Sequence, residues 1–251
     1  MHNISLKDNK KNIDSLFDKI ALRYDLLNHL LTLNIDKYWR KKTVNQILVS
    51  KDNNQNNNNK ILDIATGTGD LLIEILKQKK TTDITGIDLS ENMLEIGKEK
   101  INKYLSTNYE KGNAPKVDLL RANVEQLPFS DNSFSAITCA FGVRNFAHLD
   151  KGIKEMYRVL DTNGQLIILE FAYPKNRIIR FFYNIYFTYL LPFIGKIISK
   201  DNTAYKYLMQ SVKNFPKGKD FLEHLSACGF DNTTYKSLTC GIVNIYSATK
   251  K

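Results

Sequence analysis

A glycine turn that follows a buried strand is the first feature of this sequence that points to chemistry. The run ILDIATGTGDL, residues 61–71, passes from an apolar strand through Gly67 and Gly69 into an apolar helix. Glycines let the backbone turn sharply and let a ligand approach it closely. A dinucleotide site needs a third glycine three residues beyond Gly69, where this chain has Leu72. The loop, with Asp63 before it, therefore favours a ligand that has no pyrophosphate.

Two further polar positions follow at the ends of the next two expected strands. Asp88 closes the strand 83–89, nineteen residues after Gly69, where a carboxylate can accept hydrogen bonds from both hydroxyls of a ribose. The segment 121–129 follows the third strand and offers a polar side chain and a backbone amide to an adenine edge. Alone, Asp88 could be a helix N-terminal charge, and 121–129 an ordinary turn. Together with the glycine loop they predict S-adenosylmethionine as the cofactor.

The elements that must position these residues alternate as β and α from residue 60 onward. We expect strands at 61–65, 83–89, 117–122, 136–140 and 165–171. We expect helices at 71–77 and at 91–104, the latter with Ser90 as N-cap, and a third helix whose end covers 153–160. A helix at 219–228, stopped by Gly229, precedes two strands at 233–239 and 242–249, which can only form a tight antiparallel hairpin. This layout, an α/β fold with a parallel sheet, is typical of a Rossmann-like class I methyltransferase.

Composition bounds the remaining function classes. The 251 residues carry a net charge of +10, are 43% hydrophobic and include three widely spaced cysteines. This excludes a disordered chain and a disulfide scaffold, and no His, Cys or Asp cluster has metal-ligand spacing, so we expect no metal. The N-terminus lacks an apolar targeting segment, so we expect a cytoplasmic protein. Residues 51–60, KDNNQNNNNK, are expected to form a solvated loop.

The positive charge is concentrated in one aromatic segment. Residues 171–219 hold nine Lys and Arg against one acidic residue, whereas 61–170 are net negative. Nine aromatic residues fall within 171–193. Arg180, Asn184 and Pro192 interrupt the apolar run before it is long enough to span a bilayer. Either a lid that rests on an anionic membrane and receives a lipid-like substrate, or an ordinary buried helix pair, fits this composition.

Motifs along the whole chain identify a family. They are YDLLN (24–28), WR (39–40), ATGTGDL (65–71), LPFSDNSF (127–134), FGVRN (141–145), MYRVL (156–160), LEF (169–171) and YKYLMQ (205–210). The sequence resembles the ubiquinone/menaquinone biosynthesis C-methyltransferases. It departs from their pattern at Asp36, where they carry His, at Ala140, where they carry a small polar residue, and in the turn 161–164.

The resemblance implies a seven-stranded sheet that binds S-adenosylmethionine through Thr68, Asp88, Asn123 and Val124. It implies methyl transfer to a ring carbon of a reduced, prenylated quinone, with demethylmenaquinol as the favoured substrate and the benzoquinol of ubiquinone biosynthesis as the alternative. We expect effectively one domain, with a helical cap and Asn-rich loop at 1–59, a methyltransferase body at 60–251, and a helical lid at 171–219. Oligomeric state stays open.

Arg144 is the leading catalytic candidate, because a fixed cation lowers the pKa of a phenol and stabilises a developing phenolate. Asn145 is expected to hold the same oxygen by hydrogen bonding, and an ion-paired loop arginine is the ordinary alternative. Tyr24 and Asn28 are expected to line the substrate pocket beneath the N-terminal cap.

Two rival functions share parts of this pattern. The basic charge also fits an RNA methyltransferase, although its basic residues are interleaved with Phe and Tyr and no RNA-binding module is evident, so we expect no nucleic-acid partner. A peripheral membrane protein with an inactive cofactor fold is the non-enzymatic alternative, and intact Gly67, Gly69 and Asp88 argue against it.

Overall fold

The structure is a computed structural model of the 251-residue chain. It describes residues 32–48, 60–79, 83–110, 112–186 and 203–251, together with Asp18, Ala21, Asp25, His29 and Thr188. The single residues 18, 21, 25 and 29 are each helical. Tyr24, Asn28 and the middle of the expected lid, 189–202, lie outside the described residues.

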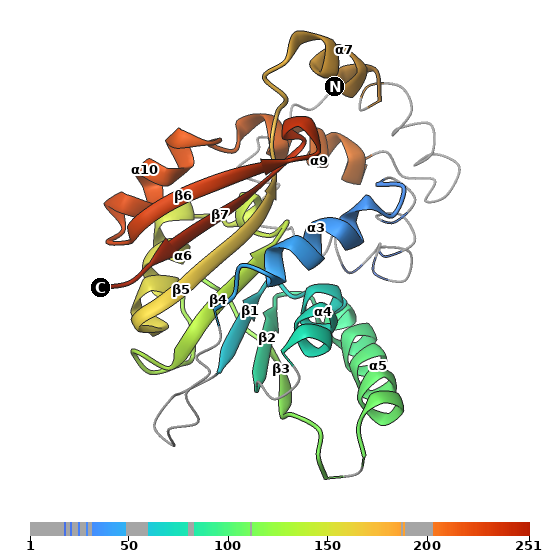
Figure 1. The fold of residues 1–251 in the computed structure, drawn as a ribbon, viewed down its shortest axis with the longest axis vertical. Helices are drawn as coiled ribbons and strands as arrows, with labels where there is room; N and C mark the ends of the chain where they lie inside the picture. The colour runs from blue at the N-terminus through green and yellow to red at the C-terminus, as the bar shows by residue number, and fades with distance from the viewer. Residues whose placement is uncertain are drawn as a thin grey trace.

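Seven strands form one sheet in the order β3-β2-β1-β4-β5-β7-β6 (Figure 1). The strands are β1 (Ile61–Ile64), β2 (Ile84–Asp88), β3 (Val117–Arg121), β4 (Phe134–Ala140), β5 (Leu160–Phe171), β6 (Asp231–Leu238) and β7 (Val243–Thr249). The first five are parallel, and β7 pairs antiparallel with both β5 and β6. The chain order reverses between β1 and β4, which is where open α/β sheets bind their ligands.

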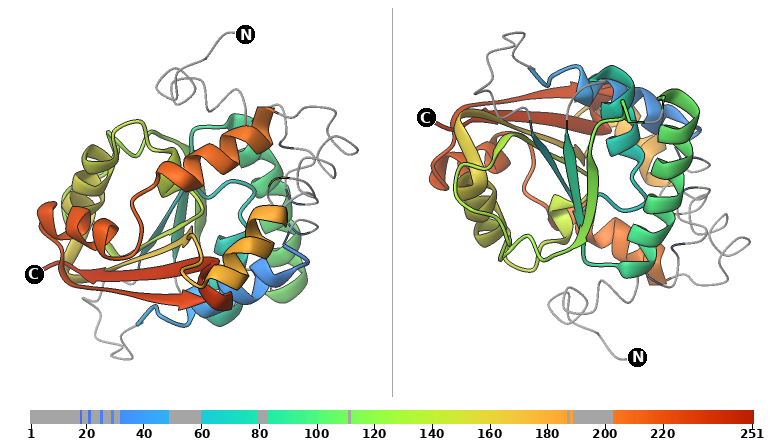
Figure 2. Two further views of the ribbon diagram at one scale, coloured as in Figure 1. Left: turned by 90° about the horizontal axis from the view of Figure 1, so that it is seen from above. Right: turned by 90° about the horizontal axis from the view of Figure 1, so that it is seen from below.

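Helices cover both faces of this sheet (Figure 2). They are α3 (Ile35–Val44), α4 (Asp70–Gln78), α5 (Glu91–Asn108), α6 (Leu149–Val159), α7 (Arg177–Ile185), α9 (Thr203–Asn214) and α10 (Lys219–Ala227), with short 3-10 turns η1 (Val143–Asn145) and η3 (Thr239–Gly241). One apolar cluster packs α3, α4 and α5 onto one face, and a second packs α6 and α10 onto the other. Strands buried on both faces explain the nearly continuous apolar runs of the sequence.

The expected elements are present, and one of them is longer than expected. Ser90 caps α5 by accepting a hydrogen bond from the Met93 amide at 3.2 Å, as the sequence predicts. The turn expected at 161–164 lies inside β5, which already begins at Leu160, and forms a bulge between the pairs Leu160–Phe134 and Gln165–Ala136. Asn163 has a φ of +63° there and donates its amide to the Lys250 carbonyl at 2.8 Å. The polar DTNG run therefore bends the strand and does not end it.

The C-terminal hairpin closes the sheet and holds α3 against it. Its turn is η3, in which Cys240 and Gly241 have φ values of +57° and +87°. Trp39 of α3 donates its indole N–H to Thr239 Oγ1 at 2.7 Å and packs edge-on against Phe171. The buried Trp39 thus serves packing between the N-terminal region and the hairpin. Among the described residues, no helix is both long enough and apolar enough to cross a membrane.

The loops that follow β1 and β4 pack against each other at the carboxyl end of the sheet. A Cβ atom on Gly142 would lie 2.5 Å from the Cβ of Ala65 and 2.9 Å from Cys139 Sγ. Ala65 and Phe141 both adopt left-handed backbone conformations, with φ values of +53° and +58°. The contact with the loop after β1 therefore requires glycine at position 142 of the FGVRN motif.

Replacing Gly142 by Ala tests this contact. The added methyl has no space, so we expect G142A to lower the free energy of unfolding by about 1–3 kcal/mol, measured by urea denaturation. The matched control is Ala147→Ser, an exposed position on the same connection. Wild-type stability in G142A would contradict the close approach of the two loops.

Candidate active site

The glycine loop leaves open space beside its backbone. Gly67 and Gly69 have φ values of +55° and +79°, and Gly69 is the N-cap of α4. A Cβ atom on Gly67 would meet no atom within 4 Å, whereas one on Gly69 would lie 3.1 Å from Ile101 Cδ1. Gly69 thus permits the packing of α5, and Gly67 leaves a surface that a ligand can approach closely. This arrangement fits S-adenosylmethionine.

Asp63 supports this loop from within the core. Its buried carboxylate accepts hydrogen bonds from Thr66 Oγ1 and Thr138 Oγ1, both at 2.7 Å. Burial raises the pKa of Asp63 from 3.8 to about 6, although the two threonine hydroxyls act in the opposite direction. Thr66 belongs to the loop and Thr138 to β4, so Asp63 joins the loop to the neighbouring strand. As a cofactor contact it stays a prediction.

Asp88 joins the glycine loop to the start of α5. One carboxylate oxygen accepts the Gly67 amide and the other the Ser90 amide, each at 2.9 Å. Burial raises its pKa above the ordinary value, against these backbone hydrogen bonds. The carboxylate lies at the carboxyl end of β2, next to Gly67, where the sequence predicts a ribose. A carboxylate has about four acceptor sites, so Asp88 can still accept a hydroxyl beside these backbone amides.

Asn123 and Val124 lie in the loop between β3 and β4, which is held by a side chain from another sequence motif. Asn123 Oδ1 accepts the Glu125 amide at 2.9 Å, and Val124 is buried. Arg158, from the MYRVL motif, donates to the carbonyls of Leu127 at 3.0 Å and Phe129 at 2.8 Å. These bonds fix the loop between β3 and β4.

Further ion pairs brace the same loop. Arg158 also pairs with Glu155 and Asp131, each at 2.8 Å, and Glu155 accepts the Leu127 amide. His148 donates its amide to Glu125 at 2.8 Å and bonds that carboxylate through Nδ1 at 2.7 Å. We did not expect a role for Arg158 or Glu125, although Arg158 falls within the MYRVL motif and Glu125 within the segment 121–129.

Two N-terminal acids reach the cofactor loops. Asp25 accepts the Thr68 hydroxyl at 2.5 Å and pairs with Lys100 of α5 at 2.7 Å. Asp18 accepts a hydrogen bond from Ser90, next to Asp88. The N-terminal region thus contacts the expected cofactor site at both the glycine loop and the start of α5. This geometry supports the predicted cap, while the pocket residues Tyr24 and Asn28 themselves are not described.

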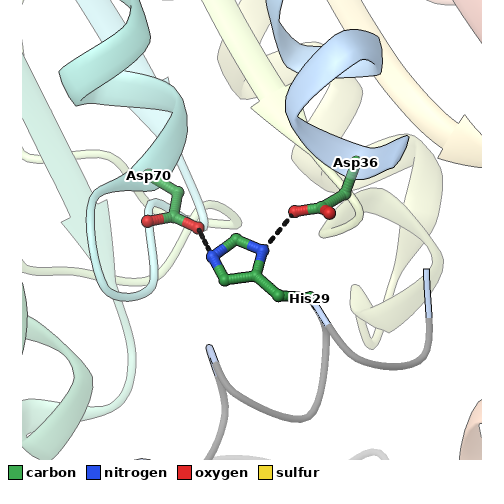
Figure 3. A group of neighbouring side chains, drawn as sticks. All are labelled: His29, Asp36 and Asp70. Atoms are coloured by element: carbon green, nitrogen blue, oxygen red, sulfur yellow. Dashed lines mark hydrogen bonds and ion pairs between the residues drawn. The ribbon is translucent and has the colours of Figure 1, made fainter. Parts of the chain in front are cut away.

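A group of one histidine and two aspartates lies beside this contact (Figure 3). His29 Nδ1 lies 2.7 Å from Asp36, and His29 Nε2 lies 3.7 Å from Asp70. Arg40 pairs with Asp36 at 2.5 Å and with Asp70 at 3.1 Å. Because Arg40 already supplies positive charge to both carboxylates, we interpret the group as an ion-pair cluster, in which Asp36 takes part where the family carries His.

Arg144 is buried after β4 and is held by Glu170. Its Nη1 lies 2.8 Å from Glu170 Oε1 and also donates to the Phe141 carbonyl, and its guanidinium carbon lies 5.4 Å from the centre of the Phe171 ring. Glu170 is fully buried and also accepts the Arg144 amide at 3.3 Å. The Arg144 Nε is buried without a hydrogen-bond partner among the described residues. Arg144 is therefore ion-paired through Nη1, as the ordinary alternative predicts, while its Nε is still available as a donor.

Asn145 lies beside Arg144 in η1 and is bonded by a residue that sequence reasoning missed. Tyr207 of α9 donates its hydroxyl to Asn145 Oδ1 at 3.1 Å. The signal was present, because Tyr207 belongs to the YKYLMQ segment that carries the family resemblance. The structure thus brings Arg144, Asn145, Glu170 and Tyr207 together at the carboxyl ends of β4 and β5.

Fold and site together define a class I S-adenosylmethionine-dependent methyltransferase fold. The structure resembles a methyltransferase of Thermotoga maritima described as a possible histamine N-methyltransferase, with a TM-score of 0.61, 18% identity and coverage of 94% of this chain and 99% of the other. It also resembles the [4+2]-cyclase SpnF, with a TM-score of 0.64, 14% identity and coverage of 95% and 94%. At such identities the likeness shows the fold alone.

Sequence comparison narrows the class to a family. The model of the ubiE/COQ5 methyltransferase family matches residues 4–250, so the chain belongs to that family. It is 41% identical over 245 residues to a demethylmenaquinone methyltransferase of Bacteroides fragilis, covering 97% of this chain and 95% of the relative. It is also 41% identical over 246 residues to a ubiquinone/menaquinone biosynthesis C-methyltransferase UbiE of Geotalea daltonii, covering 98% and 99%.

The raised pKa of Asp63 predicts a specific pH dependence of stability. The native state binds the Asp63 proton more tightly than the unfolded chain, so stability from this group is lost as the pH rises from about 4 through about 6. Asp63→Asn removes this titration. Between pH 4 and pH 7 the unfolding free energy of D63N should gain about 2 kcal/mol relative to wild type.

Urea denaturation at each pH measures this difference, and Asp118→Asn on exposed β3 is the matched control. Parallel stability curves for the wild type and D63N would show that Asp63 does not titrate between these pH values.

Proposed function

We propose that this chain transfers the methyl group of S-adenosylmethionine to a ring carbon of a reduced, prenylated quinone and converts demethylmenaquinol to menaquinol. The observation that carries the proposal is the buried Nε of Arg144, an available cationic donor at the carboxyl end of β4. Family membership and the names of the relatives in Bacteroides fragilis and Geotalea daltonii support the same reaction class.

The cofactor supplies an electrophilic methyl group on a sulfonium sulfur. The open side of Gly67, the carboxylate of Asp88 and the loop of Asn123 and Val124 lie at adjacent strand ends and are the residues we propose to hold it. Thr68 is buried in the same loop and bonded to Asp25. Because Leu72 stands where a dinucleotide loop has its third glycine, a nucleoside without a pyrophosphate is the fitting ligand.

Transfer to carbon needs a nucleophilic ring. The new carbon–carbon bond forms as the carbon–sulfur bond breaks, the electron pair of that bond returns to sulfur, and the ring carbon then loses its proton to restore aromaticity. A quinone ring is a poor nucleophile, whereas the quinol is better and its phenolate better still. The protein must therefore align the ring and favour loss of the phenolic proton.

Arg144 is suited to favour loss of the phenolic proton. A guanidinium next to a phenol lowers its pKa and stabilises the phenolate, most strongly where water is excluded. Glu170 and the Phe141 carbonyl fix Nη1, so the orientation of Nε is set by the fold. We propose that Nε contacts the phenolic oxygen of the quinol, that a water molecule accepts the proton, and that Asn145 donates to the same oxygen.

We also propose reversible association with an anionic membrane through α7. Four large apolar side chains of this helix are 40–69% exposed: Ile178, Phe181, Phe182 and Ile185. Lys175, Arg177 and Arg180 accompany them, and no acidic residue occurs between residues 171 and 200. A basic helix with an apolar outer face favours an anionic bilayer, where each Lys or Arg near the surface contributes about 1 kcal/mol.

The same helix faces inward toward the proposed site. Tyr183 is the buried residue of α7, and burial raises its pKa, while Arg144 is close enough to act against that rise. In Figure 1, α7 lies beyond the end of the sheet to which the parallel strands point. A prenylated substrate would therefore pass from the bilayer along α7 to Arg144. The localisation we propose is cytoplasmic with peripheral membrane contact.

The test of the reaction uses labelled S-adenosylmethionine with chemically reduced demethylmenaquinone or its benzoquinone counterpart. We expect methyl incorporation into the naphthoquinol. Arg144→Lys keeps one positive charge near Glu170 but removes Nε, and we expect kcat to fall by about 100-fold with cofactor affinity unchanged by calorimetry. The control is Lys98→Arg, an exchange between the same two residue types at an exposed position of α5.

Failure of the wild type with both quinols while it binds the cofactor would refute the substrate. Incorporation only into the benzoquinol would select ubiquinone biosynthesis, and salt-dependent methylation of RNA would select the RNA methyltransferase. Full activity of R144K would exclude Nε from the reaction.

The membrane contact is tested by co-sedimentation with vesicles that contain phosphatidylglycerol. Phe181→Ser with Phe182→Ser removes two exposed rings, and we expect binding at low salt to weaken by about tenfold or more. The matched control is Leu48→Ser, because Leu48 is 77% exposed outside α7. Equal binding by both variants, or no binding by the wild type, would overturn this contact.

A further inference from the structure

Tyr207 is a buried tyrosine whose hydroxyl ends at the proposed catalytic loop. It lies on α9, 62 residues from Asn145 in sequence, and donates to Asn145 Oδ1 at 3.1 Å. Asn145 is partly exposed, directly follows Arg144, and belongs to the short turn η1. A helix of the expected lid segment thus bonds a residue that we place in contact with substrate.

The hydroxyl of Tyr207 stays protonated at any working pH. Burial raises its pKa to about 12, with Glu170 adding to the rise and Arg144 opposing it. Both charged residues therefore act electrostatically on the Tyr207 hydroxyl. A neutral phenol donates its proton to the best acceptor in reach, and here that acceptor is the Asn145 carbonyl oxygen.

This bond fixes which end of the Asn145 amide is free. An amide side chain offers one carbonyl oxygen and one NH₂ group, and rotation by half a turn exchanges them. With Tyr207 donating to the oxygen, the nitrogen must point away from α9, and it has no hydrogen-bond partner among the described residues. Without that bond either end could face the substrate.

Arg144 and Asn145 then present two donors from consecutive residues. The Nε of Arg144 is buried and without a partner among the described residues, and Asn145, the next residue in η1, directs its amide nitrogen away from α9. Two fixed donors aimed at one oxygen stabilise charge there more than mobile ones, because no reorganisation is needed as the charge develops.

We propose that Tyr207 is a positioning residue of the reaction: it orients Asn145 so that the amide nitrogen donates to the same quinol oxygen as Arg144. The inference rests on the proposed function. Because Tyr207 lies on α9, the orientation of Asn145 also depends on the position of this helix. The amide nitrogen of Asn145 is in place as a donor only when α9 packs over the site.

A double-mutant cycle on the full-length protein tests this role. The variants are Tyr207→Phe, Asn145→Ala and the double variant, assayed with labelled S-adenosylmethionine and reduced demethylmenaquinone. We expect Y207F to lower kcat by about tenfold in the wild-type background and by less than about twofold in the N145A background. KM for the quinol should change by less than about twofold in Y207F, because the lost interaction strengthens as charge develops.

The matched control is Tyr246→Phe. Tyr246 is fully buried, and its hydroxyl accepts the Gly218 amide and the Asn244 side chain, each at 3.0 Å. Its loss should change kcat by the same factor with and without Asn145. Cofactor affinity by calorimetry reports whether each variant is folded. Should N145A prove unfolded, Asn145→Asp replaces it, since an Asp accepts from Tyr207 but has no amide nitrogen to donate.

The outcomes separate the two proposals. An inactive wild type refutes the proposed function. An active wild type in which Y207F loses the same factor in both backgrounds, or loses nothing, overturns the role of Tyr207 and leaves the proposed function standing.

Discussion

The burial of one carboxylate at the end of β5 constrains the whole proposed active site. Glu170 has no exposed surface, and a charge in such a place must be paired and hydrogen-bonded. Its partners are the Arg144 guanidinium at 2.8 Å and the amides of Arg144 and Phe171. Removing one member of a buried pair typically costs about 3–5 kcal/mol. The loop after β4 is thus held to β5 by charge, and its donors keep a fixed direction.

The proposed cofactor site also depends on carboxylates that accept hydrogen bonds from two segments of the chain. Asp63 and Asp88 each bond two separate segments, so each carboxylate sets the distance between a loop and a strand or helix. Asp25 and Asp18 then connect the N-terminal region to these loops. Asp25 thus contacts the glycine loop and Asp18 the start of α5, so displacing either residue would break a hydrogen bond next to the proposed cofactor site.

Local patterns allowed most of the fold to be predicted. Strand and helix periods, the Ser90 cap and the antiparallel C-terminal hairpin depend on residues close in sequence, and the structure confirms them. The turn expected at 161–164 is a bulge within β5, between the pairs Leu160–Phe134 and Gln165–Ala136, and the C-terminal tail bonds it at Asn163. Within the site, the strand-end positions of Asp88 and Arg144 follow from the motifs. The partners of Arg158 and Tyr207 do not, because Arg158 reaches the Leu127 carbonyl and Tyr207 reaches Asn145 across more than 25 residues of sequence.

The last residues of the chain lie at the opposite end of the sheet from the proposed site. Lys250 Nζ donates to the carbonyls of Tyr157 and Leu160, each at 2.8 Å, at the start of β5, whereas Glu170 lies at its far end. In Figure 1 the C-terminus and α7 accordingly lie far apart. Because the C-terminus and the proposed site lie at opposite ends of the sheet, a tag or surface linkage fused after Lys251 leaves α7 and the carboxyl ends of the strands unobstructed. A protein immobilised in this way would present the exposed apolar side chains of α7 outward.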